Sequence, residues 1–386
     1  MITHRSSSAY RSPGLGIGLL LAVLVAAPAG AMSDGALSEA LAGYGAHRAL
    51  RGGVVSCEVA DLQTGRILYS LHPDQGLIPA SNMKLFVSAT AVALFGTQFE
   101  FSTSLWARSE PGADGVVRGH LYLVGCADPA ATPKVFAELA RQLRARGVKA
   151  ISGDLVGTAP VLVGDHDAGL RGARRMGEAL GAAGIRLGGE VRAGMCPSAP
   201  CRLARHSSQS LADYLRYMNK ESRNPEADRL LQSVLACFDD PVAASPAFAL
   251  RYWAQRGLTT SGLRVADGSG YSRSSRLSAG LLRGLLSWTA ASPDAYRVLS
   301  ASLPIAGCDG TLGDRMCGTV AEGRVRAKTG TLPGVSCLSG YVERAGKPRL
   351  AFSVMMNGFS CSVETARRIQ DQMAIVMARY VHESPH

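Results

Sequence analysis

Two side chains near the start of the chain have the types and the spacing of a nucleophile and its base. Ser81 and Lys84 form a Ser-x-x-Lys element that opens an apolar run over residues 85–94. We predict that this run is a buried helix, on which a spacing of three residues places both side chains on one face. A neutral lysine amine could then deprotonate the serine hydroxyl, and free N–H groups at the helix N-terminus would favour developing negative charge.

The motif alone is weak, because a chain of this length contains about one Ser-x-x-Lys by chance. The alternative interpretation is an ordinary serine at the start of a helix, followed by a solvated lysine. Lysine is scarce here, however: only six of the 41 basic residues are lysines, at positions 84, 134, 149, 220, 328 and 347. Three of these six lie in or beside motifs, which favours the chemical interpretation.

A second motif follows about 140 residues after the first. Ser222-Arg223-Asn224 lies between two segments with helical patterns, and Asn224 is one of only four asparagines in the chain. A serine hydroxyl and an amide at this spacing can relay a proton and hold a neighbouring amine in place.

The third motif is Lys328-Thr329-Gly330-Thr331, at the end of a strand-like segment. Its lysine is a cation for a substrate carboxylate, and its glycine would let a substrate backbone approach closely. Ser-x-x-Lys, Ser-x-Asn and Lys-Thr-Gly-Thr in this order match a trio found in penicillin-binding proteins and class A β-lactamases.

The elements that must position these motifs begin and end the chain. Strand patterns over 54–61 and 66–70 are joined by a turn at 63–65 and precede the buried helix, which indicates an α+β start. Strands over 334–343 and 348–357 and an amphipathic helix over 363–381 end the chain. We expect them to complete the sheet that begins at Val54. Further helices are predicted over 36–50, 210–218, 225–238, 245–256, 278–290 and 293–300.

The pattern changes from about residue 102 to about residue 205. Strands over 119–125 and 151–157 flank a basic helix over 133–146, followed by a helical stretch over 169–183 and a short strand over 189–192. We interpret this segment as a small inserted domain.

The first 31 residues have the pattern of an export signal. Arg5 and Arg11 precede an apolar core at 15–27 and a small-residue cleavage site at 29–31. We expect a mature chain from about Met32 in the periplasm; an uncleaved anchor is the alternative. No later segment is long and apolar enough to span a bilayer, so we expect no stable membrane insertion after cleavage.

Composition limits the partners. The net charge of +11 comes almost wholly from arginine, but no basic run is interleaved with aromatic residues, so we predict no nucleic-acid partner. The nine cysteines fit an oxidising compartment, and the spacings of Cys196 with Cys201 and of Cys308 with Cys317 suit local disulfides. No Cys-x-x-Cys is present, and the only His-x-x-x-His, His382 with His386, lies on the last residues beside Pro385, so we predict no metal site. We also predict no cofactor.

The sequence resembles the low-molecular-mass class C penicillin-binding proteins, which are D-alanyl-D-alanine carboxypeptidases and endopeptidases of the peptidase S13 group. Besides the trio, Asp-Gly-Ser-Gly-Tyr-Ser-Arg at 267–273, the loop at 302–312 and Met-Asn-Lys-Glu-Ser at 218–222 are similar to segments of that family. The likeness is close from Leu203 to the C-terminal helix and looser over 36–107.

The resemblance implies an α+β fold of the penicillin-binding and serine β-lactamase-like transpeptidase type, an antiparallel sheet with helices on both faces and a small inserted α/β domain. We expect a signal peptide at 1–31, a catalytic domain at 32–106 and 205–386, and a shortened inserted domain at 107–204. The implied partners are peptidoglycan stem peptides, with β-lactam antibiotics as inhibitors.

The resemblance also implies a role for each first- and second-motif residue. Ser81 would attack the carbonyl between two terminal D-alanines and form an acyl-enzyme. Lys84 would be the base, with its pKa lowered by burial beside Lys328. Ser222 would relay a proton to the leaving amine, and Asn224 would hold Lys84 and the substrate amide.

In the third motif, Lys328, Thr329 and Thr331 would bind the terminal carboxylate of the substrate, and Gly330 would let the substrate backbone approach closely. The N–H groups of Ser81 and Thr331 would form the oxyanion hole.

Two departures from the family matter for function. Arg223 stands where the family usually has Asp or Asn, and the insertion is shorter than in the family's larger members. Arg223 therefore leaves open a non-catalytic homologue that only binds peptidoglycan peptides. A β-lactamase is the nearest enzymatic alternative, but no glutamate has an asparagine four residues later, as the deacylating element of class A enzymes requires. No Gly-x-Ser-x-Gly is present, which argues against an α/β-hydrolase.

Overall fold

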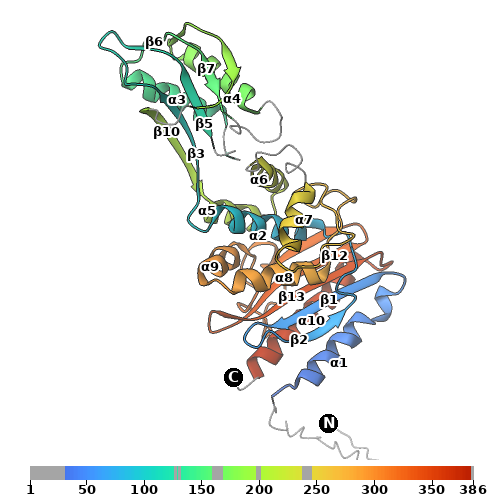
Figure 1. Cartoon of the computed structure of the whole chain (residues 1–386). Coiled ribbons are helices and arrows are strands. Elements are labelled where there is room, and N and C mark those ends of the chain that lie inside the picture. Colours follow the sequence, from blue (N-terminus) through green and yellow to red (C-terminus); the bar gives the residue numbers. More distant parts are fainter. Residues whose placement is uncertain are drawn as a thin grey trace, which may run out of the picture.

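The computed structural model describes residues 31–125, 128, 132–158, 168–196, 201–236 and 246–383. The expected export signal lies outside the described residues except for its last position. Figure 1 shows a body of sheet and helices that contains α1 and α10, and a second body reached through the strands β3 and β10.

The main sheet has five strands in the order β11 (Val325–Leu332), β12 (Val335–Arg344), β13 (Lys347–Asn357), β1 (Val54–Asp61) and β2 (Ile67–Leu71). All neighbouring pairs are antiparallel. The last strands of the chain thus lie beside the first, as predicted, and β11 is an edge strand.

Helices cover both faces of this sheet. Along β12, Cys337 and Tyr341 face a core shared with α2 (Met83–Phe95) and α8 (Ala279–Ala290). The alternate residue Leu338 faces a second core, shared with α1 (Asp34–Gly45) and α10 (Val363–Glu383). Side chains alternate between faces along a strand, so both faces are apolar only because both are covered. The predicted fold class is confirmed.

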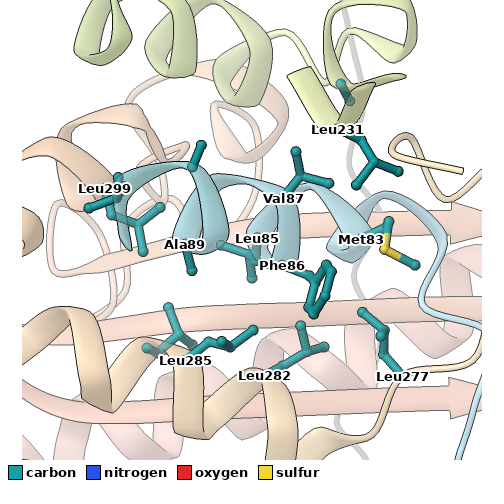
Figure 2. Packing of buried hydrophobic residues seen from close by; sticks show 14 of the residues in the cluster. Met83, Leu85, Phe86, Val87, Ala89, Leu231, Leu277, Leu282, Leu285 and Leu299 are labelled. Carbon is teal, nitrogen blue, oxygen red and sulfur yellow. The ribbon is translucent and has the colours of Figure 1, made fainter. Parts of the chain in front are cut away.

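The helix α2 is buried on every side, which explains why its sequence is apolar throughout. Every residue from Met83 to Val92 is buried. Figure 2 shows Phe86 pointing from α2 towards Leu282 of α8, with Leu231 of α6 near the opposite side of the helix. Because α2 is enclosed, the residues at its N-terminal end have little freedom to move.

The remaining helices of this body are α5 (Leu211–Lys220), α6 (Asn224–Ala236), α7 (Pro246–Ala254) and α9 (Pro293–Ser302). They agree with the predicted helices to within a few residues. The helix expected over 36–50 is shorter: α1 ends at Gly45, and a separate 3-10 turn follows at Arg48–Leu50.

The second body contains a sheet in the order β10 (Cys201–Ser210), β3 (Glu100–Ala107), β5 (Leu121–Gly125), β7 (Leu155–Gly157) and β9 (Val191–Ala193). The sequence did not predict β3 and β10 as strands. At the sheet edge, β10 is half-exposed and rich in serine and arginine, so it lacks a strong apolar alternation.

Three short parallel strands form the other sheet of this body: β4 (Val116–Val117), β6 (Ala150–Ile151) and β8 (Arg186–Leu187). The helices α3 (Pro133–Ala145) and α4 (Ala168–Ala182) pack with both sheets around a separate core.

The single strand expected over 151–157 is wrong, because that segment belongs to two sheets. β6 ends at Ile151, and β7 begins at Leu155 in the five-stranded sheet. Between them Gly153 packs so closely on the backbone of Gly119 that a Cβ there would lie 2.8 Å from the carbonyl carbon.

The expected domain boundaries, 106/107 and 204/205, fall within or near the paired strands β3 and β10. The division into a catalytic and an inserted domain stays a prediction.

Local disulfides are not formed between the cysteines considered above, since all four are free thiols. The thiol of Cys201 instead lies 3.1 Å from a carboxylate oxygen of Glu110, and that of Cys317 lies 3.4 Å from the carbonyl of Gly313.

Among the described helices, none combines the length and the apolar character needed to cross a bilayer.

Candidate active site

Ser81 lies in a short 3-10 turn, Ala80–Asn82, that leads directly into α2. It therefore precedes the α-helix rather than forming its first turn. Ala80 has a φ of 46°, in the left-handed region that non-glycine residues rarely adopt. Such a conformation costs about 1–3 kcal/mol and persists only where the surrounding structure enforces it.

The amine of Lys84 contacts three oxygen atoms. Its Nζ lies 2.9 Å from Ser81 Oγ, 2.8 Å from Asn224 Oδ1 and 2.9 Å from the carbonyl oxygen of Ser269. The amide and carbonyl oxygens can only accept, so each takes one N–H of the amine. A neutral amine has two N–H groups and one lone pair. With both donors occupied, the lone pair is left to accept the hydroxyl proton of Ser81, the geometry of a general base.

Burial favours this neutral form. Lys84 has no exposed surface, and desolvation lowers its pKa to about 8, although Asp228, Asp267 and Glu226 act in the opposite direction. The expected burial of Lys84 is confirmed.

The resemblance implied that Lys328 helps to lower the pKa of Lys84, but burial alone lowers it, and the repulsion between the two lysines instead shifts the pKa of Lys328. Full burial lowers the pKa of Lys328 well below its usual range, and the charge of Lys84 lowers it further. Since repulsion between two amines is reciprocal, protonation of one disfavours protonation of the other.

Ser222 lies in the tight connection between α5 and α6, where its φ of 53° is left-handed. Its backbone N–H donates to the carbonyl of Asn219, and Lys328 Nζ donates to its Oγ at 3.0 Å. Asn224 is the first residue of α6. The turn therefore presents Ser222 to Lys328 and Asn224 to Lys84.

Gly330 lies where β11 meets the Ser81 turn. A Cβ at this position would be 2.7 Å from the carbonyl oxygen of Pro79 and 3.1 Å from the backbone nitrogen of Asn82. The close approach that Gly330 permits is thus made by the protein's own backbone, rather than by a substrate as the sequence suggested.

Thr329 and Thr331 lie on the side of β11 opposite to Lys328 and Gly330, and both are half-buried. The hydroxyl of Thr329 lies 2.7 Å from that of Thr311. A guanidinium nitrogen of Arg367, on α10, donates to the hydroxyl of Thr331 at 3.0 Å. Sequence reasoning gave no role to Thr311 or Arg367, because neither lies in a recognised short motif.

The segment 267–273 supplies a backbone group to the site. The N–H groups of Gly268 and Ser269 both donate to Asp228, at 2.9 and 2.8 Å, which aims the Ser269 carbonyl at Lys84. Asp267 accepts from the N–H groups of Gly270 and Ser272 and thereby forms the turn. Sequence reasoning missed the contact of the Ser269 carbonyl with Lys84, because every residue has a backbone carbonyl and no residue type marks this one.

Asn82 joins the nucleophile turn to the sheet. Its fully buried amide nitrogen donates to Ser339 Oγ at 2.7 Å, and Ser339 is the cross-strand partner of Lys328. The residue sits inside the Ser-x-x-Lys motif at a variable position, so the motif alone does not reveal its contact.

Arg223, the charged departure in the second motif, is held by two neighbours. Its guanidinium lies 4.5 Å from the ring centroid of Tyr217, and its Nε lies 3.1 Å from a carboxylate oxygen of Glu226. The carboxylate of Glu226 offsets the positive charge of Arg223, and the ring of Tyr217 adds a cation–π contact.

The described residues thus bring all three motifs together: Ser81 and Lys84 touch directly, Asn224 contacts Lys84, and Ser222 contacts Lys328. Thr329, Gly330 and Thr331 follow on the same strand.

Solved structures share this fold. Penicillin-binding protein 4 (DacB) of Haemophilus influenzae, solved with a β-lactam, matches with a TM-score of 0.66 at 22% identity, covering 90% of this chain and 99% of that one. The peptidoglycan endopeptidase Bd3459 of Bdellovibrio bacteriovorus matches with a TM-score of 0.56 at 17% identity, covering 82% of this chain and 90% of that one.

Sequence comparison shows the family. The D-alanyl-D-alanine carboxypeptidase of Actinomadura sp. (strain R39) is 30% identical over 95% of this chain and 90% of its own length. A carboxypeptidase DacB of Mycolicibacterium smegmatis is 29% identical over 84% of this chain and 80% of its own length. The model of the D-Ala-D-Ala carboxypeptidase 3 (S13) family matches residues 37–168 and 159–380. The chain therefore belongs to the D-Ala-D-Ala carboxypeptidase 3 (S13) family.

Proposed function

We propose that this protein is a serine DD-peptidase that cleaves the D-Ala-D-Ala bond or D-Ala cross-links of peptidoglycan peptides through an acyl-enzyme. The observation that carries the proposal is the contact of Lys84 with Ser81, in which both N–H groups of a neutral amine are taken by Asn224 and Ser269. Family membership supplies the substrate class.

The first half of the reaction uses these groups in order. Ser81 Oγ attacks the carbonyl carbon of the penultimate D-alanine while Lys84 accepts the hydroxyl proton. The tetrahedral oxyanion would be held by the N–H groups of Ser81 and Thr331. The C–N bond then breaks, and the leaving amine takes a proton from Lys84 through Ser222. This step leaves an ester between Ser81 and the substrate.

The second half repeats the chemistry with water. Lys84, again neutral, takes a proton from water, which attacks the ester carbonyl, and Ser81 leaves with a proton. Lys328, Thr329 and Thr331 would hold the terminal carboxylate during acylation. β-Lactams would acylate the same serine and act as inhibitors.

The proposed location is the periplasm, after removal of the signal at 1–31, where stem peptides of the cell wall are accessible. The sequence pattern of residues 1–31 supports this location.

The test is to incubate the purified protein with a fluorescent penicillin and, separately, with muropeptides. The proposal expects stable labelling that Ser81→Ala abolishes, together with release of D-alanine or cleavage of cross-links. Rapid loss of label with hydrolysis of the antibiotic would instead identify a β-lactamase. Absence of both labelling and turnover would leave only a peptide-binding homologue.

A further inference from the structure

Arg367 is placed beside the third motif by the packing of α10 on the sheet. Thr331 and Ser336 are cross-strand partners on β11 and β12. Gln370, fully buried on α10, accepts from the hydroxyl of Ser336 at 3.3 Å. One turn earlier on α10, Arg367 donates to the hydroxyl of Thr331 at 3.0 Å. The buried contact between Gln370 and Ser336 therefore fixes the position of α10 along the sheet and places Arg367 next to Thr331.

The acidic residues on this part of α10 already have arginine partners. Asp371 accepts two hydrogen bonds from Arg315, at 2.6 and 3.0 Å, and Glu364 pairs with Arg368 at 3.2 Å. None of the ion pairs within the described residues includes Arg367. The half-buried guanidinium of Arg367 thus spends one donor on a neutral hydroxyl and forms no ion pair in the described part of the chain, although its charge acts at longer range on Asp371.

Lys328, the other basic residue of the third motif, does not carry a permanent positive charge. Lys328 is fully buried, and its amine donates inwards to Ser222 Oγ and to the carbonyl of Thr329. Its burial and the nearby amine of Lys84 disfavour the ammonium form. A guanidinium stays protonated at every physiological pH and offers up to five N–H donors in a planar fork that matches a carboxylate.

We infer that Arg367 is a specificity-determining residue that binds the free terminal carboxylate of the substrate, together with Thr331. This inference rests on the proposed function for its substrate class. It makes Arg367 the permanent positive charge of the pocket, so the protein should discriminate a peptide acid from the same peptide with a neutral end.

The experiment compares two ligands, an acyl peptide ending in D-Ala-D-Ala and the same peptide ending in D-Ala-D-alaninamide. Binding is measured by calorimetry in the Ser81→Ala background, which removes turnover. Arg367→Gln should weaken binding of the acid about 10- to 100-fold, the range for loss of a charged hydrogen bond, and change binding of the amide less than about twofold. Arg367→Lys should recover part of the lost affinity.

Arg368→Gln is the matched control, because Arg368 is adjacent on the same helix but is 77% exposed and points to Glu364. It should leave the preference for the acid unchanged. Equal weakening of both ligands by Arg367→Gln, or no weakening of the acid, would overturn the inference. Turnover of the acid by the protein with Ser81 intact is scored separately and reports on the proposed function, since the binding ratio needs no turnover.

Discussion

The guanidinium of Arg223 and the carboxylate of Glu226 form an ion pair, 3.1 Å apart, at the start of α6. Glu226 is almost fully buried, and its negative charge is one of three that raise the pKa of Lys84. Arg223 therefore offsets a charge that would otherwise hold a proton on the base. The arginine at position 223 is thus paired with Glu226, which offsets its charge, and the contact between Lys84 and Ser81 is intact.

The ion pair leads to a prediction for the pH profile of acylation. Because the base must be neutral, the rate constant for penicillin labelling should rise with pH through a midpoint of about 8. Arg223→Ala exposes Lys84 to the uncompensated charge of Glu226, so the midpoint should move up and the rate at pH 7 should fall about twofold. Stopped-flow or quenched labelling across pH 6–10, roughly the span that brackets the midpoint, measures both.

Two control variants separate charge from packing in this test. Arg223→Lys keeps the positive charge and should leave the midpoint unchanged, whereas Glu226→Gln removes the negative charge and should lower it. If Arg223→Ala lowered the midpoint, the electrostatic account of the pair would be wrong.

Asn224 should act as a neutral ligand of the base. Asn224→Asp places a carboxylate next to Lys84 Nζ in place of an amide oxygen at 2.8 Å. An opposite charge at this distance raises a lysine pKa by about 1–3 units, so labelling at pH 7 should fall about tenfold or more and recover at higher pH. Asn224→Ala removes the contact without adding charge, and its loss of rate should not recover at high pH. An unchanged profile for Asn224→Asp would refute the assignment.

Gly330 should be intolerant of any side chain. In Gly330→Ala the new Cβ would lie 2.7 Å from the Pro79 carbonyl oxygen and push the Ser81 turn away from β11. Overpacking of this kind costs about 1–3 kcal/mol, and labelling should fall together with the free energy of unfolding. The control is Gly43→Ala in α1, where nothing lies within 4 Å of the new atom. It should be neutral or stabilise by about 0.5–1 kcal/mol.

Asn82 should stabilise the fold as well as the site. Asn82→Ala leaves the hydroxyl of Ser339 without its amide donor in a fully buried place, so the free energy of unfolding in urea should fall by about 1–2 kcal/mol. Labelling should slow, because Asn82 ties the nucleophile turn to the strand opposite Lys328. Ser81→Ala provides the contrast, since it should abolish labelling with little change in stability. Full stability of Asn82→Ala would contradict this role.

The sequence by itself determined the motif residues and most of the main sheet. Runs of strand-forming residues located β1, β2, β12 and β13, with a turn between the first two, and the three motifs in order identified the site, because short-range spacing is visible in a chain. It also placed Lys84 in an apolar run, from which its burial follows.

Only the tertiary structure decided which distant groups meet the motifs. The Ser269 carbonyl reaches Lys84 across 185 positions of sequence, and Arg367 reaches Thr331 across 36. The strand β10 went unpredicted for a related reason, since its polar residues pair with β3 rather than alternate with a strong apolar period. The strand β3 does alternate, with Phe101, Leu105 and Ala107 fully buried, so its local pattern was visible in the sequence. Backbone ligands and cross-element contacts carry no local pattern, because they arise from how enclosed elements such as α2 and α10 pack on the sheet.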